Sequence, residues 1–143
     1  MESSEPDLIR ALERGLGAYV QAVAAAIGVP AEGTTIEISD TATAYLGLSR
    51  PWPGRPRHDV MLVWSERRGW TVAVETAPSE DTVVLARWPG EELVPPPDEV
   101  ARFVDDAAAG RVAEKHRITA VPGTRRELAR RLEEYVFQQS DQV

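Results

Sequence analysis

The sequence shows few groupings of residues that could catalyse a reaction or bind a metal. It has 143 residues, no cysteine and two histidines, His58 and His116. A metal site would need both histidines together with carboxylates, and their positions show no recognised ligand spacing. The Gly-x-Ser-x-Gly motif of a nucleophilic serine is also absent. Glu75 could face a pocket, but the alternation around it favours solvent or an arginine partner. We therefore predict no catalytic residue, no metal site and no cofactor.

One segment has the glycine spacing of a phosphate-binding loop. Gly28 and Gly33 are separated as in a Walker A motif, but Thr34 stands at the lysine position. The segment also follows a helical pattern, whereas that motif follows a strand. We interpret it as a connector between a helix and a strand.

The most distinctive candidate for binding is a basic, proline-rich segment at residues 49–58. It contains three arginines, three prolines and Trp52 but no acid, within a chain of net charge -7. Prolines reduce the entropy lost on binding, and arginine and tryptophan are enriched among the residues that dominate protein interfaces. Three interpretations stay open: a rigid connector, a loop that docks a protein partner, and an anion or nucleotide site.

The arginines at residues 125–131 could belong to a helix that reads nucleic acid. However, Glu127 stands four residues before Arg131, and two further glutamates follow directly. The chain also has 23 acidic against 16 basic residues, a surplus that disfavours contact with a phosphate backbone. We interpret this stretch as a solvated, salt-bridged helix face and predict that nucleic acid is not the partner.

Apolar residues at helical spacing predict a long helix over residues 7–28, a second over 98–109 and a third that begins after Thr124. Gly28 is placed to end the first helix. Thr124, with a glutamate three residues later, forms a capping box at the start of the third. Gly15 lies inside the first helix, where a small residue would let another element approach closely.

Short apolar or alternating segments predict five strands between the first and second helices. No link between them is long enough for a helical crossover, so we expect an antiparallel meander. Gly69 would supply the positive φ of the hairpin turn after the third strand. The predicted fold class is α+β, with an N-terminal helix, a five-stranded antiparallel meander and two or three C-terminal helices. The strands are expected at residues 34–39, 43–48, 59–64, 70–76 and 82–88.

The length of the chain favours one domain. We expect residues 7–139 to form a single α+β domain, with frayed termini at 1–6 and 140–143. No apolar run approaches the roughly 18 residues of a membrane span. The acidic start does not resemble a secretory signal. We therefore expect an acidic protein that does not bind a membrane.

The third strand carries an unbroken apolar run at residues 60–64. A sheet that is covered on one face produces alternating strands, so this run predicts that both faces are covered. The cover would be helices on both sides, or helices on one side and a partner on the other. Trp64 and Trp70 stand symmetrically about the following turn, which predicts that they are cross-strand neighbours.

Four blocks of sequence are distinctive: LxRGLxxYV from Leu12, AYLGL from Ala44, LVWSERRGWxVAVE from Leu62 and PPPxxVARFV from Pro95. Together they resemble a small actinobacterial family known only as a domain of unknown function, over roughly residues 8–106. The resemblance implies an actinobacterial source and a cytoplasmic location but no catalytic residue. The order of elements is also similar in outline to type III secretion chaperone-like domains, which bind proteins.

These features favour a non-enzymatic protein-binding or regulatory module that acts through a protein partner or as a homodimer. The alternative is a small-ligand or nucleotide-binding domain, with or without enzymatic activity, with a pocket between the sheet and the helices. The predicted contact surface is the sheet region around the two hairpin tryptophans together with the basic loop. The competing interpretation is that the protein's own helices cover both indoles. The predicted partner-binding residues are Trp52, Arg55, Arg57, Trp64, Arg67, Arg68 and Trp70.

Overall fold

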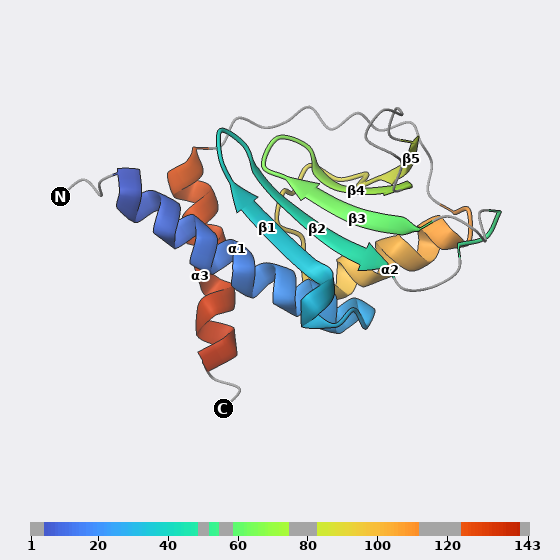
Figure 1. Cartoon of the computed structure of the whole chain (residues 1–143), viewed down its shortest axis with the longest axis horizontal. Helices are drawn as coiled ribbons and strands as arrows, with labels where there is room; N and C mark the ends of the chain where they lie inside the picture. The colour runs from blue at the N-terminus through green and yellow to red at the C-terminus, as the bar shows by residue number, and fades with distance from the viewer. Residues whose placement is uncertain (1–4, 49–51, 55–58, 75–82, 112–123, 141–143) are drawn as a thin grey trace.

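The structure, a computed structural model, describes residues 5–48, 52–54, 59–74, 83–111 and 124–140. A long N-terminal helix leads into an antiparallel five-stranded sheet, and two helices follow (Figure 1). This order confirms the predicted α+β class. The elements are α1 (Glu5–Ile27), the 3-10 turn η1 (Ala31–Gly33), β1 (Thr34–Ile38), β2 (Ala42–Leu48), β3 (Val60–Ser65), β4 (Gly69–Val74), β5 (Val83–Arg87), α2 (Pro97–Ala108) and α3 (Arg125–Ser140).

The sheet is a simple meander in which each strand pairs with the next in the order β1-β2-β3-β4-β5. All four pairings are antiparallel, as predicted. In the β3–β4 hairpin Trp64 lies directly opposite Trp70, which confirms the cross-strand prediction. Gly69 has a φ of 72°, the left-handed conformation that the hairpin turn requires. The hairpin therefore has the register that its sequence predicts.

The helices cover one face of the sheet, which we call the inner face. α1 packs against β1, α2 packs against both α1 and β4, and α3 packs along α1. Figure 1 shows α1 running beside β1 and α3 crossing α1. The core between these layers contains fully buried side chains from both, among them Leu16, Tyr19, Leu62, Trp64 and Val72.

The opposite face of the sheet, the outer face, is partly exposed among the described residues: Ala73 on β4 is 2% exposed, whereas positions on β2 and β3 contact solvent. Along β3 buried positions alternate with partly exposed ones, so Met61 and Val63 keep contact with solvent. Tyr45, the cross-strand neighbour of Val63, is 43% exposed. The described helices all pack on the inner face, so of the two predicted arrangements the one with helices on both sides is not seen among the described residues, and a partner on the second face stays a prediction. The outer-face residues are Thr35, Glu37, Thr43, Tyr45, Gly47, Met61, Val63, Ser65, Thr71, Ala73 and Arg87.

The helix boundaries agree with the sequence signals that predict them. Gly28 follows α1 with a φ of 91°, and the Thr124 hydroxyl accepts a hydrogen bond of 3.1 Å from the backbone N–H of Glu127 at the start of α3. A Cβ on Gly15 would lie 2.7 Å from the Cβ of Leu132 in α3. The absence of a side chain at Gly15 is thus what lets α3 approach α1 so closely.

Candidate functional site

The two hairpin tryptophans lie in the core. Trp64 and Trp70 are both 0% exposed. The indole N–H of Trp64 donates a hydrogen bond of 2.6 Å to the carbonyl of Leu93, in the segment before α2. The indole N–H of Trp70 donates one of 3.0 Å to the hydroxyl of Tyr19 in α1. The protein's own elements cover both indoles, so neither presents a surface to a partner in this structure.

Tyr19 connects three parts of the core. Its hydroxyl accepts the bond from Trp70 and donates one of 2.6 Å to the carbonyl of Pro95. Its ring lies 4.8 Å, centroid to centroid, from the ring of Tyr135 in α3. Burial raises the pKa of Tyr19 far above its ordinary value, so the hydroxyl stays protonated and can act as the donor. Burial also raises the pKa of Tyr135. These contacts join the sheet to the helices. The Tyr19 hydroxyl therefore serves as a structural hydrogen-bonding group.

The other predicted partner-binding residues divide into three sets. Trp52 is 5% exposed and belongs to the core. Arg67 and Arg68 are exposed in the β3–β4 turn. Arg55 and Arg57 lie outside the described residues, as do the two histidines and Glu75. Of the predicted set, therefore, the β3–β4 turn is the described part that reaches the surface.

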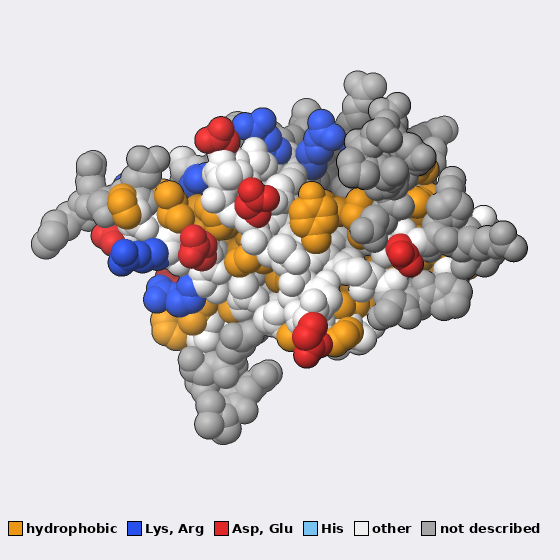
Figure 2. All heavy atoms as spheres, in the orientation of Figure 1, with side chains coloured by type: hydrophobic (Ala, Val, Ile, Leu, Met, Phe, Trp, Pro, Cys, Tyr) orange, Lys and Arg blue, Asp and Glu red, His pale blue; other side chains and the backbone are white. Residues whose placement is uncertain are grey.

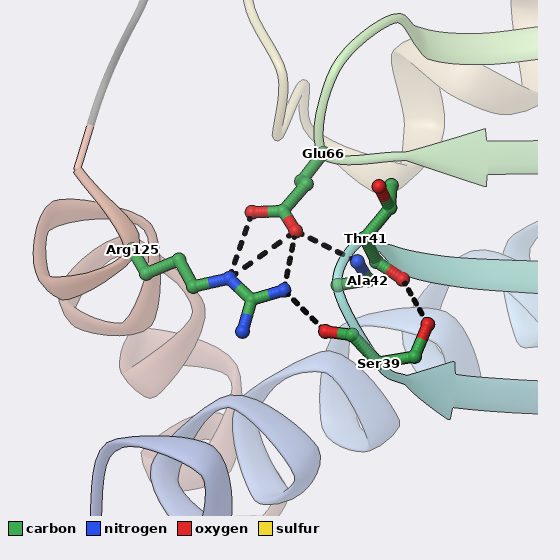
Figure 3. A network of polar contacts seen from close by, with 5 residues as sticks. All are labelled: Ser39, Thr41, Ala42, Glu66 and Arg125. Atoms are coloured by element: carbon green, nitrogen blue, oxygen red, sulfur yellow. Dashed lines mark hydrogen bonds and ion pairs between the residues drawn. The ribbon is translucent and has the colours of Figure 1, made fainter. Parts of the chain in front are cut away.

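An ion pair attaches this turn to the start of α3 (Figure 3). The Arg125 guanidinium donates to the Glu66 carboxylate through Nη2 at 2.7 Å and through Nε at 3.2 Å. The same carboxylate accepts the backbone N–H of Ala42 at 2.8 Å, and Arg125 Nη2 also donates to the carbonyl of Ser39 at 2.6 Å. One charged pair thus holds two hairpin turns and a helix together. No local sequence pattern indicates this role of Glu66, because its partner Arg125 lies 59 positions away in the chain.

A cavity of about 280 Å³ lies beside this ion pair. Four carboxylates line it, and its basic lining residue is Arg131. Glu66 lies here together with Glu91 and Glu92, so the β3–β4 turn is close to this acidic pair. An anion such as a nucleotide would be repelled by such a lining. The lining residues are Glu66, Glu91, Glu92, Leu93, Thr124, Glu127, Leu128 and Arg131.

The described residues contain no group of three or more histidine, aspartate or glutamate side chains arranged to hold a metal ion. Within the same residues, no helix is both long enough and apolar enough to cross a bilayer.

The exposed arginines of α3 lie among acidic side chains. Arg126 and Arg130 line a cavity of about 190 Å³ between α3 and the start of α1, and the other charged residues of its lining are Arg14, Asp7 and Glu133. A surface of mixed sign does not provide the continuous positive potential that a phosphate backbone needs. Further along α3, Phe137 is 62% exposed.

The outer face of the sheet combines exposed apolar side chains with separated charges. One row of paired residues crosses all five strands: Thr35, Tyr45, Val63, Thr71 and Arg87. The centre of this row is uncharged, and Figure 2 shows hydrophobic side chains at the surface over β2 and β3, with charged side chains around them. An apolar centre with a charged rim is the composition of a protein contact surface.

Comparison with known proteins places the chain in a family without assigning an activity. No curated protein and no solved structure gives a significant match. One family model matches residues 19–106, from within α1 to near the end of α2, and so includes the whole sheet. The chain therefore belongs to a family of unknown function, DUF6292.

Proposed function

We propose that this protein is a non-enzymatic protein-binding or regulatory module and that the outer face of its sheet is the contact surface. The observation that carries this proposal is the exposure of Tyr45, 43%, at the centre of a face that also leaves Val63 and Met61 in contact with solvent. Covering the exposed part of this ring with a partner would remove apolar surface from water, which favours association.

The residue types on this face suit a protein partner. Tyrosine is common among the residues that dominate binding energy, because its ring buries a large area and its hydroxyl can still make a hydrogen bond. Tyr45 has uncharged neighbours in both directions along its row, Thr35 and Val63. No charge has to be desolvated at this centre when a partner covers it.

The alternative function, small-ligand or nucleotide binding between the sheet and the helices, has less support. Trp64, Trp70 and Tyr19 fill the described space there, and all three are 0% exposed. The cavity next to α3 has an acidic lining that disfavours nucleotides.

We further propose that the protein is actinobacterial and cytoplasmic, and that residues 7–139 form one cooperative domain.

Site-specific photo-crosslinking tests the contact surface. A photoreactive phenylalanine analogue is placed at Tyr45 in one variant and at Phe137, an exposed aromatic position on α3, in a control variant. The variants are irradiated in extract from the source organism, with and without an excess of unlabelled protein.

We expect a discrete protein adduct from position 45 that excess wild type removes and excess Tyr45→Lys protein does not remove. Equal adducts from positions 45 and 137, or none from position 45, would contradict the proposal. Native mass spectrometry of the purified protein tests the alternative, which requires a retained small molecule.

A further inference from the structure

We propose that the groove between α1 and α3 binds a small organic monoanion, a carboxylate attached to a compact apolar body. The groove has a volume of about 190 Å³ and lies between α3 and the start of α1. It belongs to the layer of helices that packs on the inner face, so this site is separate from the outer face of the sheet. Three features support the inference: an apolar floor, three arginines at the rim and a small net positive charge.

The groove arises from the way in which the two helices pack. α1 and α3 are in close contact at Gly15, where a Cβ would lie 2.7 Å from the Cβ of Leu132. Figure 1 shows α3 crossing α1. Helices that cross at a close contact diverge on either side of it. The small side chains of Ala11 and Ala129 line the space that opens there. The hollow is therefore a product of the same packing that brings α3 onto α1.

The floor of the groove is apolar. Leu8 and Ala11 of α1 line it together with Ala129 and Val136 of α3. Ala129 is buried and the other three side chains are partly buried. An apolar protein cavity of about 150 Å³ is large enough to bind one benzene molecule. The groove therefore has room for a body of about one ring, and covering this floor would remove apolar surface from water.

Three arginines stand at the rim of this floor. Arg14 comes from α1, and Arg126 and Arg130 come from successive turns of α3. All three are exposed, and within the described part of the chain none of them forms a hydrogen bond or an ion pair. In contrast, Arg125 on the same helix is bound to Glu66. A guanidinium group with free N–H donors can bind both oxygens of a carboxylate.

The charge of the rim favours a monoanion. Asp7 and Glu133 also line the groove, so three bases and two acids give it a net charge of +1. A monocarboxylate neutralises this charge, whereas the second charge of a phosphate monoester would stand unbalanced beside two carboxylates. A cation would be repelled by the arginines. The surplus of acids in the whole chain, with its net charge of -7, further disfavours a polyanion.

The site depends on the contact between the two helices. Arg14 belongs to α1, whereas the other two arginines belong to α3. The complete rim therefore exists only when α3 is packed on α1. A ligand that binds only this arrangement stabilises it. The concentration of the anion would thus control how firmly α3 is held against α1.

Titration of the purified full chain with benzoate, followed by the chemical shifts of the backbone amides in NMR, tests the site. Benzoate supplies one carboxylate and one ring. At constant ionic strength we expect saturable shifts confined to α1 and α3, with a dissociation constant of about 1 mM or lower. Acetate lacks the ring, benzamide lacks the charge and phenyl phosphate carries a second charge. Each of these three probes should bind weaker than benzoate by about fivefold or more.

Substitutions distinguish the arginines of the groove from their neighbours. Arg130→Gln is expected to weaken benzoate binding by about fivefold or more. Arg131→Gln is the matched control, because Arg131 is the next residue on the same helix and equally exposed but lines the other cavity. It should change the affinity by less than about twofold at physiological salt, which screens exposed charges. Glu133→Gln removes an acid from the rim and should strengthen binding by about twofold.

Three results would overturn the inference: shifts that do not saturate or that spread over the whole chain, equal binding of benzoate and acetate, or equal effects of Arg130→Gln and Arg131→Gln. Circular dichroism checks that each variant is folded, and Arg126→Gln replaces Arg130→Gln if the latter is not. The comparison of benzoate with acetate and benzamide uses the wild type alone, so it decides the matter even if every variant fails to fold. The crosslinking experiment at Tyr45 is independent of this site, so failure of either proposal leaves the other standing.

Discussion

Glu66 and Arg125, separated by 59 positions in the sequence, form a two-pronged ion pair that attaches the β3–β4 turn to the first residue of α3. The Glu66 side chain is 14% exposed and the Arg125 side chain 28%. Glu66 also accepts the backbone N–H of Ala42. Its removal would leave both a guanidinium and an amide without this acceptor.

Glu66→Ala is therefore expected to lower the free energy of unfolding by about 1–3 kcal/mol, because partly buried donors lose their acceptor. Urea denaturation measures the change. The matched control is Asp106→Ala, which breaks the exposed Asp106–Arg111 pair, whose side chains are 36% and 66% exposed. An exposed pair contributes little, so the control should change stability by less than about 1 kcal/mol. Equal effects of the two variants would contradict the assigned role of Glu66.

Gly15→Ala is expected to destabilise the protein although alanine is the better helix former. The new Cβ would lie 2.7 Å from the Cβ of Leu132, and forced overlap in a packed contact costs typically about 1–3 kcal/mol. At Gly17 a Cβ would meet its nearest neighbour, Ile36, at 3.8 Å. Gly17→Ala should therefore stabilise the protein by up to about 1 kcal/mol. Thermal melting shows whether each substitution raises or lowers the stability of the protein. Stabilisation by both substitutions would refute the close approach of α1 and α3.

The raised pKa of Tyr19 predicts that the folded protein loses stability in alkaline solution. Because the pKa of Tyr19 is raised in the folded state, the unfolded chain releases this proton first, near its ordinary value of about 10. The contribution of the protonated Tyr19 hydroxyl to the free energy of unfolding is fully present below that pH. It declines as the pH rises above it, since the unfolded state then binds fewer protons than the folded state. Tyr19→Phe should remove the part of the decrease in unfolding free energy at high pH that Tyr19 causes. Urea denaturation from about pH 8 to pH 11 measures it, and identical slopes for wild type and variant would contradict the prediction.

The same Tyr19→Phe variant should also be less stable at neutral pH. It leaves the indole N–H of Trp70 without its acceptor and the Pro95 carbonyl without its donor. A buried group that loses its partner costs about 1–3 kcal/mol. A variant as stable as wild type at neutral pH would show that these bonds contribute no net stability.

Substitutions on the two faces of the sheet should differ strongly in their effect on folding. Trp64→Ala removes a fully buried side chain and is expected to lower the free energy of unfolding by about 3–5 kcal/mol. Tyr45→Lys, on the outer face, loses cross-strand contacts worth about 0.2–1 kcal/mol. Chemical denaturation of both variants tests the assignment of faces, and a Tyr45 effect as large as the Trp64 effect would contradict it.

The fold was largely predictable because its signals are local. Helix periodicity, Thr124 as a cap and Gly69 in a tight turn each determine structure within a few residues. The meander follows from links too short for a crossover. The register of Trp64 and Trp70 follows from the symmetry of their hairpin.

The candidate site was less predictable because it depends on what covers each residue. The apolar run of β3 does not distinguish Val63, which remains partly exposed, from Leu62, which is buried. Tryptophan is common both in interfaces and in cores, so residue type alone did not show that Trp64 and Trp70 face inward. The partners of Glu66 come from two other segments, and no local pattern brings Arg125 to it.

The packing of α3 against α1 affects the choice of an expression fragment. The family match covers residues 19–106, whereas the contact between Gly15 and Leu132 lies outside it on both sides. A fragment cut at those limits would leave the Tyr19 ring without Tyr135 and Glu66 without Arg125. Fragment boundaries that keep α1 and α3 whole would preserve the packing of these two helices. Boundaries placed at the limits of the family match would remove it.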